Sequence, residues 1–324
     1  MKKVLVTGSN SLLGSNLIRE LLSLNYTVKG MVRNPSTFLL PGHPNLELAQ
    51  GSLFGDLSEL MEDCFSVIHV AAETSQNLLT YSEYQRTNVE GTLNLLHAAV
   101  ENKLERFIFV STANTIGYED DFNAGEERQP IKAPYDQSFY SLSKLEAEER
   151  ILHYSDRIDI IITNPTFMLG AYDTKPSSGK IILMGLNRRF IFHPPGGKNF
   201  VNARDVAKGL IRCLEQGKNG EKYLLSGENM SYRDFFIKLN ALQNRNPVLI
   251  NLPKWSLMLL GYAGEVLRKL KIKTSLSLVS MKILCVDNFY SNNKSKSELK
   301  LSYQSIEHGI SEAVAYFKER GQIR

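Results

Sequence analysis

Tyr140 and Lys144 are the pair of residues in this sequence best suited to proton transfer. On a helix, a spacing of four positions brings the two side chains to one face, one turn apart. A phenol titrates near pH ~10 in water, and a neighbouring ammonium stabilises its phenolate and lowers that pKa. The pair favours acid–base chemistry, although the same spacing also occurs in ordinary surface pairs.

A second chemical feature is the stretch TGSNSLLG, Thr7 to Gly14, which directly follows the apolar run Lys3–Val6. It has the outline of a loop that holds the pyrophosphate of a dinucleotide, with Gly8 for the tight turn and Gly14 for close packing of helix on strand. Ser11 stands where the middle glycine is usual. A hydroxyl at a helix N-terminus caps free N–H groups or donates to a phosphate. We therefore expect Ser11 to change the affinity for the dinucleotide and not to abolish its binding.

The residues after the next predicted strand bear on the choice of dinucleotide. The run is Met31-Val32-Arg33-Asn34-Pro35, which has no carboxylate to accept hydrogen bonds from an adenosine ribose. A guanidinium pairs with a 2′-phosphate and stacks on adenine. Arg33 therefore favours NADP(H) over NAD(H), the alternative being a solvated surface arginine.

Composition limits the remaining function classes. The formal charge of +4 comes from 38 basic and 34 acidic residues that are interspersed, so no basic stripe indicates nucleic acid. Cys64, Cys213 and Cys285 are widely separated, and the chain starts on a predicted strand, which together favour a cytoplasmic, reducing compartment. His69, His97 and His153 lack the spacing of metal ligands, so we expect no metal site.

The most lipid-like segment, Trp255–Leu260, is too short to span a bilayer and runs into Arg268, Lys269, Lys271 and Lys273. We therefore expect no stable membrane insertion. A helix that lines a pocket or a dimer face is the plainer interpretation, and contact with a membrane surface is the alternative.

Apolar runs alternate with helical periodicity through the first half of the chain, which predicts an α/β fold with a Rossmann-type doubly wound parallel sheet. The predicted strands are Val4–Val6, Tyr26–Val32, Leu46–Ala49, Ser66–Val70, Arg106–Val110 and Ile158–Thr163, with helices after the glycine loop, from about Tyr84 to Val100, and over Tyr140–Leu152. We assign residues 1–165 to this dinucleotide-binding domain.

Residues 166–324 are expected to form a smaller, mostly helical C-terminal substrate lobe, partly interleaved with the sheet. Gly and Pro cluster at Lys175–Gly179 and His193–Gly197, which predicts loops around a substrate pocket. Helices are predicted over Arg204–Leu214, Tyr232–Leu242, Pro253–Leu270 and Ile306–Phe317. The charged run Glu146, Glu148, Glu149 and Arg150 is expected to be a solvated helix face.

Taken together, the motifs resemble the extended short-chain dehydrogenase/reductase family over nearly the whole chain. The matching strings are TGSNSLLG, His69-Val70-Ala71-Ala72, Asn88-Val89-Glu90-Gly91-Thr92, Phe109-Val110-Ser111-Thr112, Tyr140 to Lys144, Asn164-Pro165-Thr166 and Phe200 to Val206. Arg33, Asn164-Pro165-Thr166 and the tail Ser295 to Tyr303 are most similar to the dihydroflavonol reductase and 3β-hydroxysteroid dehydrogenase branch. The chain departs from the family at Ser11, and at Ser52 where an aspartate often meets the adenine.

The resemblance implies an oxidoreductase that transfers hydride between a nicotinamide and the carbonyl of a small, moderately apolar molecule. Tyr140 would donate the proton, Lys144 would hold the ribose hydroxyls and lower the tyrosine pKa, and Thr112 would hydrogen-bond the carbonyl oxygen. The implied cofactor-binding residues are Gly8, Asn10, Ser11, Leu12, Gly14, Arg33, Ser52, Leu53, Val70, Ala71, Ala72, Asn88, Tyr140, Lys144, Pro165 and Ser178. It also implies a possible homodimer through the apolar stripes of Val89–Val100 and Leu142–Leu152.

Two alternatives remain open. A nucleotide-sugar epimerase or dehydratase would use the same Tyr140 and Lys144 with a retained NAD, and Arg188, Arg189 and Lys198 could serve its diphosphate. A non-catalytic regulator that senses dinucleotide is the other, with Ser11 as its best support.

Overall fold

The computed structural model describes residues 2–119 and 123–323, and seven parallel strands in this part of the chain form the central sheet. Their order is β10-β6-β5-β4-β1-β2-β3. The strands are β1 (Lys3–Thr7), β2 (Thr27–Val32), β3 (Leu46–Gln50), β4 (Cys64–His69), β5 (Arg106–Val110), β6 (Asp159–Pro165) and β10 (Lys222–Leu225). The first six lie where the sequence predicts them, with ends that differ by at most two residues.

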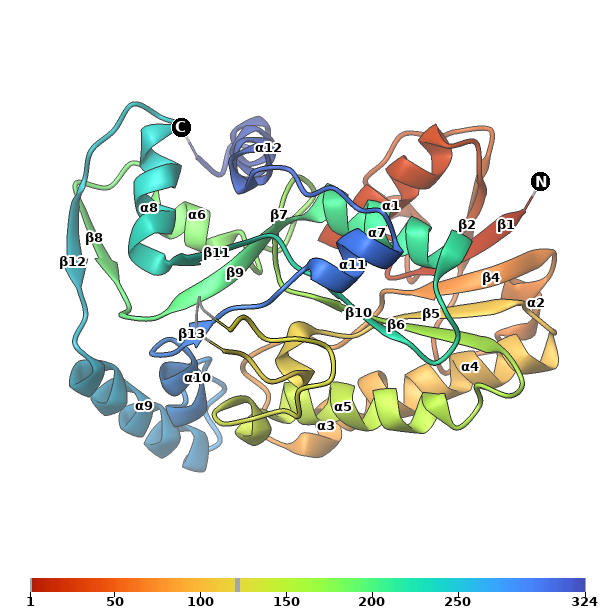
Figure 1. Ribbon diagram of the computed structural model, residues 1–324, viewed down its shortest axis with the longest axis horizontal. Coiled ribbons are helices and arrows are strands. Elements are labelled where there is room, and N and C mark those ends of the chain that lie inside the picture. The colour runs from red at the N-terminus through yellow and green to blue at the C-terminus, as the bar shows by residue number, and fades with distance from the viewer. Residues whose placement is uncertain (1, 120–122, 324) are drawn as a thin grey trace.

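Helices cover both faces of this sheet (Figure 1). On one face lie α1 (Leu12–Ser23) and α7 (Ala203–Gln216), and on the other lie α4 (Gly91–Glu101) and α5 (Phe139–Leu152). Two short helices, α2 (Ser58–Met61) and α3 (Tyr81–Gln85), belong to the second side. The doubly wound Rossmann-type fold is therefore confirmed.

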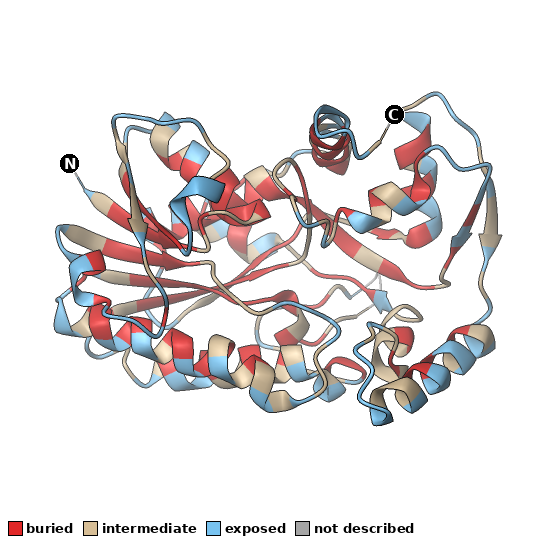
Figure 2. Cartoon of the chain, turned by 180° about the vertical axis from the view of Figure 1, so that it is seen from behind, coloured by how far each residue is buried: buried red, intermediate tan, exposed pale blue. Residues whose placement is uncertain are grey.

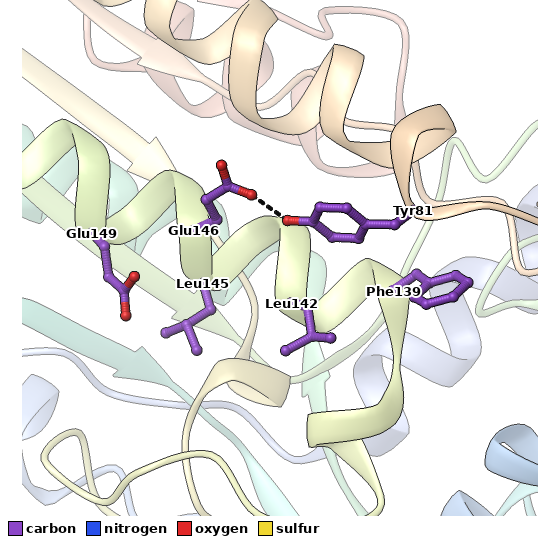
Figure 3. Close-up of a pocket in the computed structure, with 6 residues that line it drawn as sticks. All are labelled: Tyr81, Phe139, Leu142, Leu145, Glu146 and Glu149. Carbon is purple, nitrogen blue, oxygen red and sulfur yellow. Dashed lines mark hydrogen bonds between the residues drawn. The ribbon is translucent and has the colours of Figure 1, made fainter.

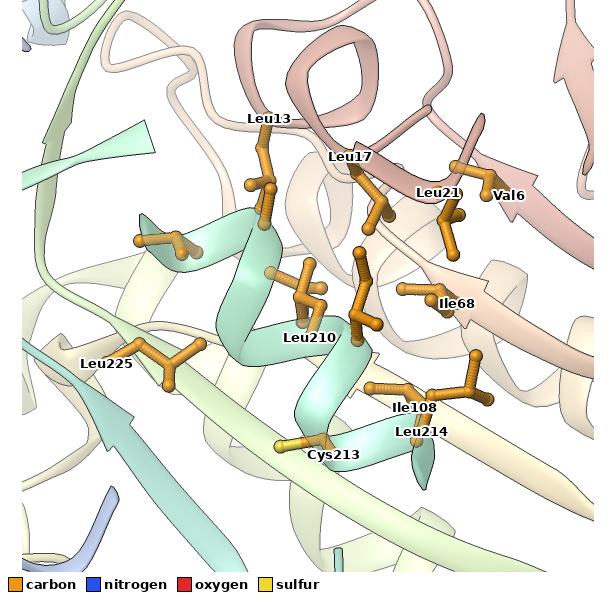
Figure 4. Packing of buried hydrophobic residues seen from close by; sticks show 14 of the residues in the cluster. Val6, Leu13, Leu17, Leu21, Ile68, Ile108, Leu210, Cys213, Leu214 and Leu225 are labelled. Carbon is orange, nitrogen blue, oxygen red and sulfur yellow. The ribbon is translucent and has the colours of Figure 1, made fainter. Parts of the chain in front are cut away.

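Alternation along the strands divides the buried side chains between two cores. Val4 and Val6 of β1 join the core under α1 and α7, whereas Leu5 joins the core under α4 and α5. Figure 4 shows the first core, in which Leu17 of α1 faces the side chains of α7, among them Leu210. Because helices cover both faces, the red buried positions of Figure 2 follow the strands and the inner sides of the helices.

The helix predicted from about Tyr84 to Val100 is one continuous helical stretch with an irregular middle. It begins earlier, with α3 capped by Thr80 and Glu83, passes through a π-helical turn at Arg86–Glu90, and continues as α4. Such π turns are often found at functional sites, and this one carries Asn88.

The second half of the chain returns to the central sheet through β10 and also builds two smaller sheets that the sequence patterns do not predict. The first contains β7 (Phe167–Leu169), β9 (Gly197–Asn202), β11 (Glu228–Ser231) and β13 (Asp287–Asn288), and the second pairs β8 (Phe190–His193) with β12 (Val248–Asn251). Apart from β9, which has six residues, these strands hold only two to four residues, too few to show a clear alternation.

Six further helices complete this half of the chain. They are α6 (Lys180–Gly185), α8 (Tyr232–Ala241), α9 (Lys254–Lys269), α10 (Leu278–Ile283), α11 (Asn293–Glu298) and α12 (Ile306–Glu319). The predicted helices near α7, α8, α9 and α12 are confirmed within three residues at each end. Phe200 of β9 stacks on Phe235 of α8 with ring centroids 4.5 Å apart, in a third core that also includes α12. Among the helices of the described residues, none is long and apolar enough to cross a membrane.

Candidate active site

The glycine loop joins β1 to α1 at the carboxyl edge of the sheet, beside the point where the strand order reverses between β1 and β4. Gly8 has a φ of +67°, and a Cβ there would lie 2.7 Å from the backbone nitrogen of Ala71. A Cβ at Gly14 would lie 2.2 Å from the carbonyl oxygen of Gly8. The two outer glycines are therefore required by the backbone, and their edge is where open α/β sheets bind ligands.

Ser11 is the N-cap of α1, as predicted. Its Oγ accepts a hydrogen bond from the Gly14 N–H at 3.0 Å, and its own N–H donates to the Gly8 carbonyl at 3.0 Å. This cap leaves the N–H groups of Leu12 and Leu13, in the first turn of the helix, without an intrahelical acceptor. A positive-φ turn that leads into free helical N–H groups fits the pyrophosphate of a dinucleotide.

Residues that flank the loop lie on neighbouring strand ends. The Asn10 side chain donates to the Thr37 carbonyl at 2.6 Å, which ties the loop to the segment after β2. Arg33 directly follows β2 and is exposed, and no described residue forms an ion pair with its guanidinium. Ser52 is exposed, whereas Leu53 is buried against Gly91.

His69, at the end of β4, is a buried structural histidine. Its Nδ1 lies 2.7 Å from the Thr7 hydroxyl, and its Nε2 lies 3.0 Å from the Thr92 hydroxyl. The Thr92 hydroxyl donates its proton to the Asn88 carbonyl, so it accepts a hydrogen bond from the Nε2–H of His69. The Thr7 hydroxyl accepts from the Ala71 N–H and donates its proton to Nδ1. Burial lowers the pKa of His69 to about 3, so the ring is neutral near pH 7 and fixes the start of the Val70–Ala72 segment.

Asn88 connects that segment to α5. Its side chain accepts from the Glu73 N–H at 2.7 Å, donates to the Glu73 carbonyl at 3.1 Å, and donates to the Ser143 hydroxyl at 3.0 Å. Ser143 in turn donates to the Tyr140 carbonyl at 2.8 Å. The π-helical turn thus positions the residue that holds the strand end and the helix of Tyr140 together.

Tyr140 lies in the first turn of α5, which Ser138 caps. The residue is half-buried, and its phenol forms a hydrogen bond with Thr112, which follows β5. Burial raises the pKa of Tyr140 to about 12, against the lowering effect of the bond to Thr112. The lowering expected from Lys144 together with an oxidised nicotinamide is not present in the protein alone, where burial dominates the pKa of Tyr140 and Lys144 itself is weakly basic.

Lys144 lies one turn further along α5 and is 1% exposed. Its Nζ donates to the Val110 carbonyl at 2.7 Å and lies 3.9 Å from the centroid of the Phe109 ring. Burial lowers the pKa of Lys144 to about 7, although the charge of Glu148 raises it. The ammonium is therefore held against the end of β5, close to the segment that carries Thr112.

Glu148 was expected on a solvated face and is instead fully buried. Its carboxylate accepts from Thr115 at 2.8 Å, from Asn164 at 2.9 Å and from Ser111, and it pairs with Lys222 of β10 at 2.5 Å. The signal for this was present in the sequence, because Glu148 is four residues after Lys144 and so shares its inward face. Glu148 thereby holds the residues on either side of Thr112.

The rest of that charged run is nearer the expectation. Glu149 and Arg150 are exposed, and Arg150 pairs with Glu146 at 2.8 Å. Glu146 accepts a hydrogen bond from the Tyr81 hydroxyl, as Figure 3 shows, so its side chain connects α5 to α3.

The last two predicted residues are Pro165 and Ser178. Pro165 is buried at the end of β6, opposite Leu225 of β10, and directly follows Asn164, whose side chain donates to the Thr112 carbonyl at 3.0 Å. Ser178 lies in the loop before α6, and among the described residues no hydrogen bond joins it to the glycine loop or to Tyr140. The structure thus brings together the glycine loop, Val70–Ala72 and Asn88, and, through Asn88, the Thr112–Tyr140–Lys144 group. Within the described chain no group of three or more His, Cys, Asp or Glu side chains could hold a metal ion.

Relatives of known description match nearly the whole chain. The chain is 30% identical to a dihydroflavonol 4-reductase-like protein of Synechocystis, covering 98% of this chain and 95% of that protein. It is 26% identical to sterol demethylase protein B of Methylococcus capsulatus, covering 98% and 99% of the two chains. Related oxidoreductases thus span nearly the whole length of the protein.

Solved structures agree on the fold. The crystal structure of gox2253 superposes with a TM-score of 0.84 at 28% identity over the full length of both chains. A UDP-glucuronic acid 4-epimerase of Bacillus cereus, solved with UDP-glucuronic acid and NAD, gives a TM-score of 0.75 at 21% identity and covers 98% and 99% of the two chains.

The sequence profile of the NAD dependent epimerase/dehydratase family matches residues 4–226, which include the glycine loop, Thr112, Tyr140 and Lys144. With this match and with reductases among its relatives, the chain belongs to the NAD-dependent epimerase/dehydratase family, the extended short-chain dehydrogenases/reductases.

Proposed function

We propose that this protein is an NADPH-dependent reductase of a ketone or aldehyde on a small, moderately apolar molecule. The observation that carries the proposal is the phenol of Tyr140, hydrogen-bonded to Thr112, on the helix that Asn88 ties to the segment after β4. A pKa raised to about 12 keeps the phenol protonated near pH 7, which suits a proton donor to the oxygen of a carbonyl under reduction.

When bound, the reduced nicotinamide would supply the hydride. Tyr140 donates its proton to the oxygen on which negative charge develops, and Thr112 donates a hydrogen bond to the same oxygen. Lys144, held by the Val110 carbonyl, holds the ribose hydroxyls of the cofactor. Glu148 and Asn88 touch none of the reacting atoms in this scheme and act by positioning the segments that carry Thr112 and Tyr140.

Arg33 supports the choice of NADPH. It follows β2 directly and is exposed without an ion pair to any described residue, so its guanidinium is available to a 2′-phosphate. We expect Arg33→Asp to shift binding from NADPH to NADH, measured by fluorescence titration of cofactor-stripped protein. Equal affinities of the variant and the wild type for NADPH would contradict this role.

An apolar substrate is supported by the names of two relatives. Sterol demethylase protein B of Methylococcus capsulatus and a farnesyl-dihydroquinoline-oxide ketoreductase of Stigmatella aurantiaca are 26% and 27% identical to this chain. Both names refer to molecules with large hydrocarbon parts, and the second describes reduction of a ketone.

The test is consumption of NADPH with a panel of apolar ketones and aldehydes. Tyr140→Phe should lower turnover by about 10²–10⁴-fold, as expected on loss of a general acid, and should leave NADPH binding unchanged. Tyr154→Phe is the matched control, because Tyr154 bonds to His97 in an exposed pair. Undiminished turnover in Tyr140→Phe would contradict the assignment of Tyr140 as the proton donor.

An epimerase with retained NAD is the second candidate, favoured by solved relatives of the same fold that contain NAD and a UDP-sugar. NAD that copurifies tightly and resists exchange would favour it, whereas exchangeable NADPH would favour the reductase. Cofactor binding without turnover on any carbonyl would instead support a dinucleotide-sensing regulator.

A further inference from the structure

Helix α9 presents a stripe of large apolar side chains to solvent. Trp255, Leu259, Tyr262, Val266 and Leu270, here called the α9 stripe, are 67%, 60%, 60%, 59% and 66% exposed. Their spacing of three and four positions places them along one face of the helix and its C-cap. Five such residues in one line form a contiguous apolar surface, which soluble monomers rarely leave uncovered.

The opposite face of α9 is locked against the protein, so the stripe cannot rotate inward. Gly261 and Gly264 are buried, and a Cβ at these positions would lie 2.9 Å from the Leu278 Cα and 2.4 Å from the Leu276 carbonyl oxygen. The backbone of α9 therefore packs directly on the segment that leads into α10. Figure 1 shows the helix at one end of the molecule, beside β12.

The charges around the stripe are mainly positive. Between positions 248 and 286 the sequence has six basic residues and a single acidic one, Glu265. The Glu265 carboxylate accepts the Leu278 N–H at 3.0 Å, so it is turned toward α10. Lys254, Lys269 and Lys271 are exposed at the two ends of the stripe, which gives this surface an excess of positive charge.

We propose that the α9 stripe binds the surface of an anionic lipid bilayer, with the helix lying in the plane of the interface. An amphipathic helix with apolar residues on one face and basic residues beside them has the composition of such helices. Trp255 and Tyr262 are the side chains that prefer the boundary between headgroups and acyl chains. A second copy of this chain is a poorer occupant, because pairing two such faces would bring their lysines together.

The C-terminal end of α9 is fixed near the candidate active site. Arg268 Nη2 donates to the Leu78 carbonyl at 2.8 Å, and Lys273 lies 3.9 Å from Glu83. Both partners lie between β4 and the π-helical turn that carries Asn88. Binding of the stripe to lipid therefore brings the segment after β4 near the bilayer, and this holds whether or not the reductase proposal is correct.

The chain offers a probe within the stripe itself, because Trp255 is its single tryptophan. The experiment adds vesicles of phosphatidylcholine, with or without phosphatidylglycerol, to the full-length protein and follows Trp255 emission. We expect a blue shift with the anionic vesicles, and quenching when their acyl chains are brominated. High salt should weaken this binding, since exposed charges are screened.

Two sets of variants keep Trp255 as the probe. The triple substitution Leu259→Ser, Val266→Ser and Leu270→Ser should abolish the blue shift, whereas Leu24→Ser, at the 55% exposed C-cap of α1, should not. Lys269→Gln and Lys271→Gln together should weaken binding by more than about tenfold, since each lysine near an anionic surface contributes roughly fivefold. Circular dichroism checks that each variant is folded.

Three outcomes would overturn the proposal. The first is no change of Trp255 emission in wild type with either vesicle. The second is equal binding to neutral and anionic vesicles. The third is a self-associating wild type, without vesicle binding, that the triple substitution turns into a monomer, which would assign the stripe to a second copy of the chain.

Discussion

The side chain of Lys144 binds its proton less tightly in the folded protein than in the unfolded chain. Burial lowers its pKa from 10.5 to about 7, so between these values the unfolded chain binds more protons than the folded protein. The contribution of Lys144 to the free energy of unfolding therefore rises with pH over this range, by at most about 1.4 kcal/mol per pH unit. At pH 7 and below, the charged lysine costs the fold the most.

We predict that the stability difference between wild type and Lys144→Met changes with pH in the corresponding direction. In urea denaturation without cofactor, wild type should gain stability relative to the variant between pH 7 and pH 9. Parallel pH profiles of the two proteins would show that Lys144 keeps its proton in the fold.

Glu148 is the second buried charge that the fold depends on. Glu148→Ala removes the acceptor of Ser111, Thr115 and Asn164 and leaves Lys222 without its partner. Breaking a buried pair in this way costs about 3–5 kcal/mol, and since Lys222 is partly exposed we expect the lower end. Urea denaturation measures the loss, with the exposed Glu149→Ala as control. Equal midpoints for the two variants would contradict the structural role of Glu148.

At the same scale, the sequence predicts some site residues better than others. Tyr140 and Lys144 are readable because their spacing on one helix defines their common face. The partners of Glu148 come from the segment after β5, from β6 and from β10, which are far apart in the chain, so no local pattern predicts them. The raised pKa of Tyr140 in the protein alone is not predictable for a related reason: the spacing shows the neighbouring lysine but not the depth of burial.

Among the elements, the β1–loop–α1 unit depends most on close backbone approach. Gly14→Ala would place a Cβ 2.2 Å from the Gly8 carbonyl oxygen, and relief of the clash must move α1 away from β1. We expect a loss of about 1–3 kcal/mol in stability, as for other overpacked positions, and much weaker NADPH binding.

Gly42→Ala is the control for this prediction, because a Cβ there meets no atom within 4 Å. Calorimetric unfolding and a cofactor titration on both variants make the comparison. If Gly14→Ala binds NADPH like wild type, the loop does not hold the pyrophosphate as proposed.

The predictability of the elements follows their length and burial. The predicted bounds of β5 and α5 agree with the structure almost to the residue, because a continuous apolar run and a long periodic stretch give strong signals. The sequence patterns do not predict β10, Lys222–Leu225, although it completes the central sheet, since these four residues stand outside the regular alternation of strands and helices in the first half of the chain. The strands of the two small sheets stand outside that alternation as well, and most of them are equally short.

At the scale of the whole molecule, the outer face of α5 leaves apolar area uncovered. A shallow depression there is lined by Tyr81, Phe139, Leu142 and Leu145, with Glu146 and Glu149 at its rim (Figure 3). We predict that two copies of the chain pair through this face, as the resemblance to dimeric short-chain dehydrogenases suggests. Leu145→Arg would place a charge in the centre of that interface, where charged residues are depleted.

We expect the wild type to sediment as a dimer. The dissociation constant of the Leu145→Arg dimer should be more than tenfold higher, because loss of a central contact typically costs about 2 kcal/mol of binding free energy. Leu24→Arg, at an exposed residue on the opposite side of the sheet, should leave the dimer intact. Because dimer formation stabilises the folded chain by mass action, the melting temperature of wild type should also rise with protein concentration. A wild type that is monomeric at every concentration, with a constant melting temperature, would contradict dimer formation through the apolar face of α5.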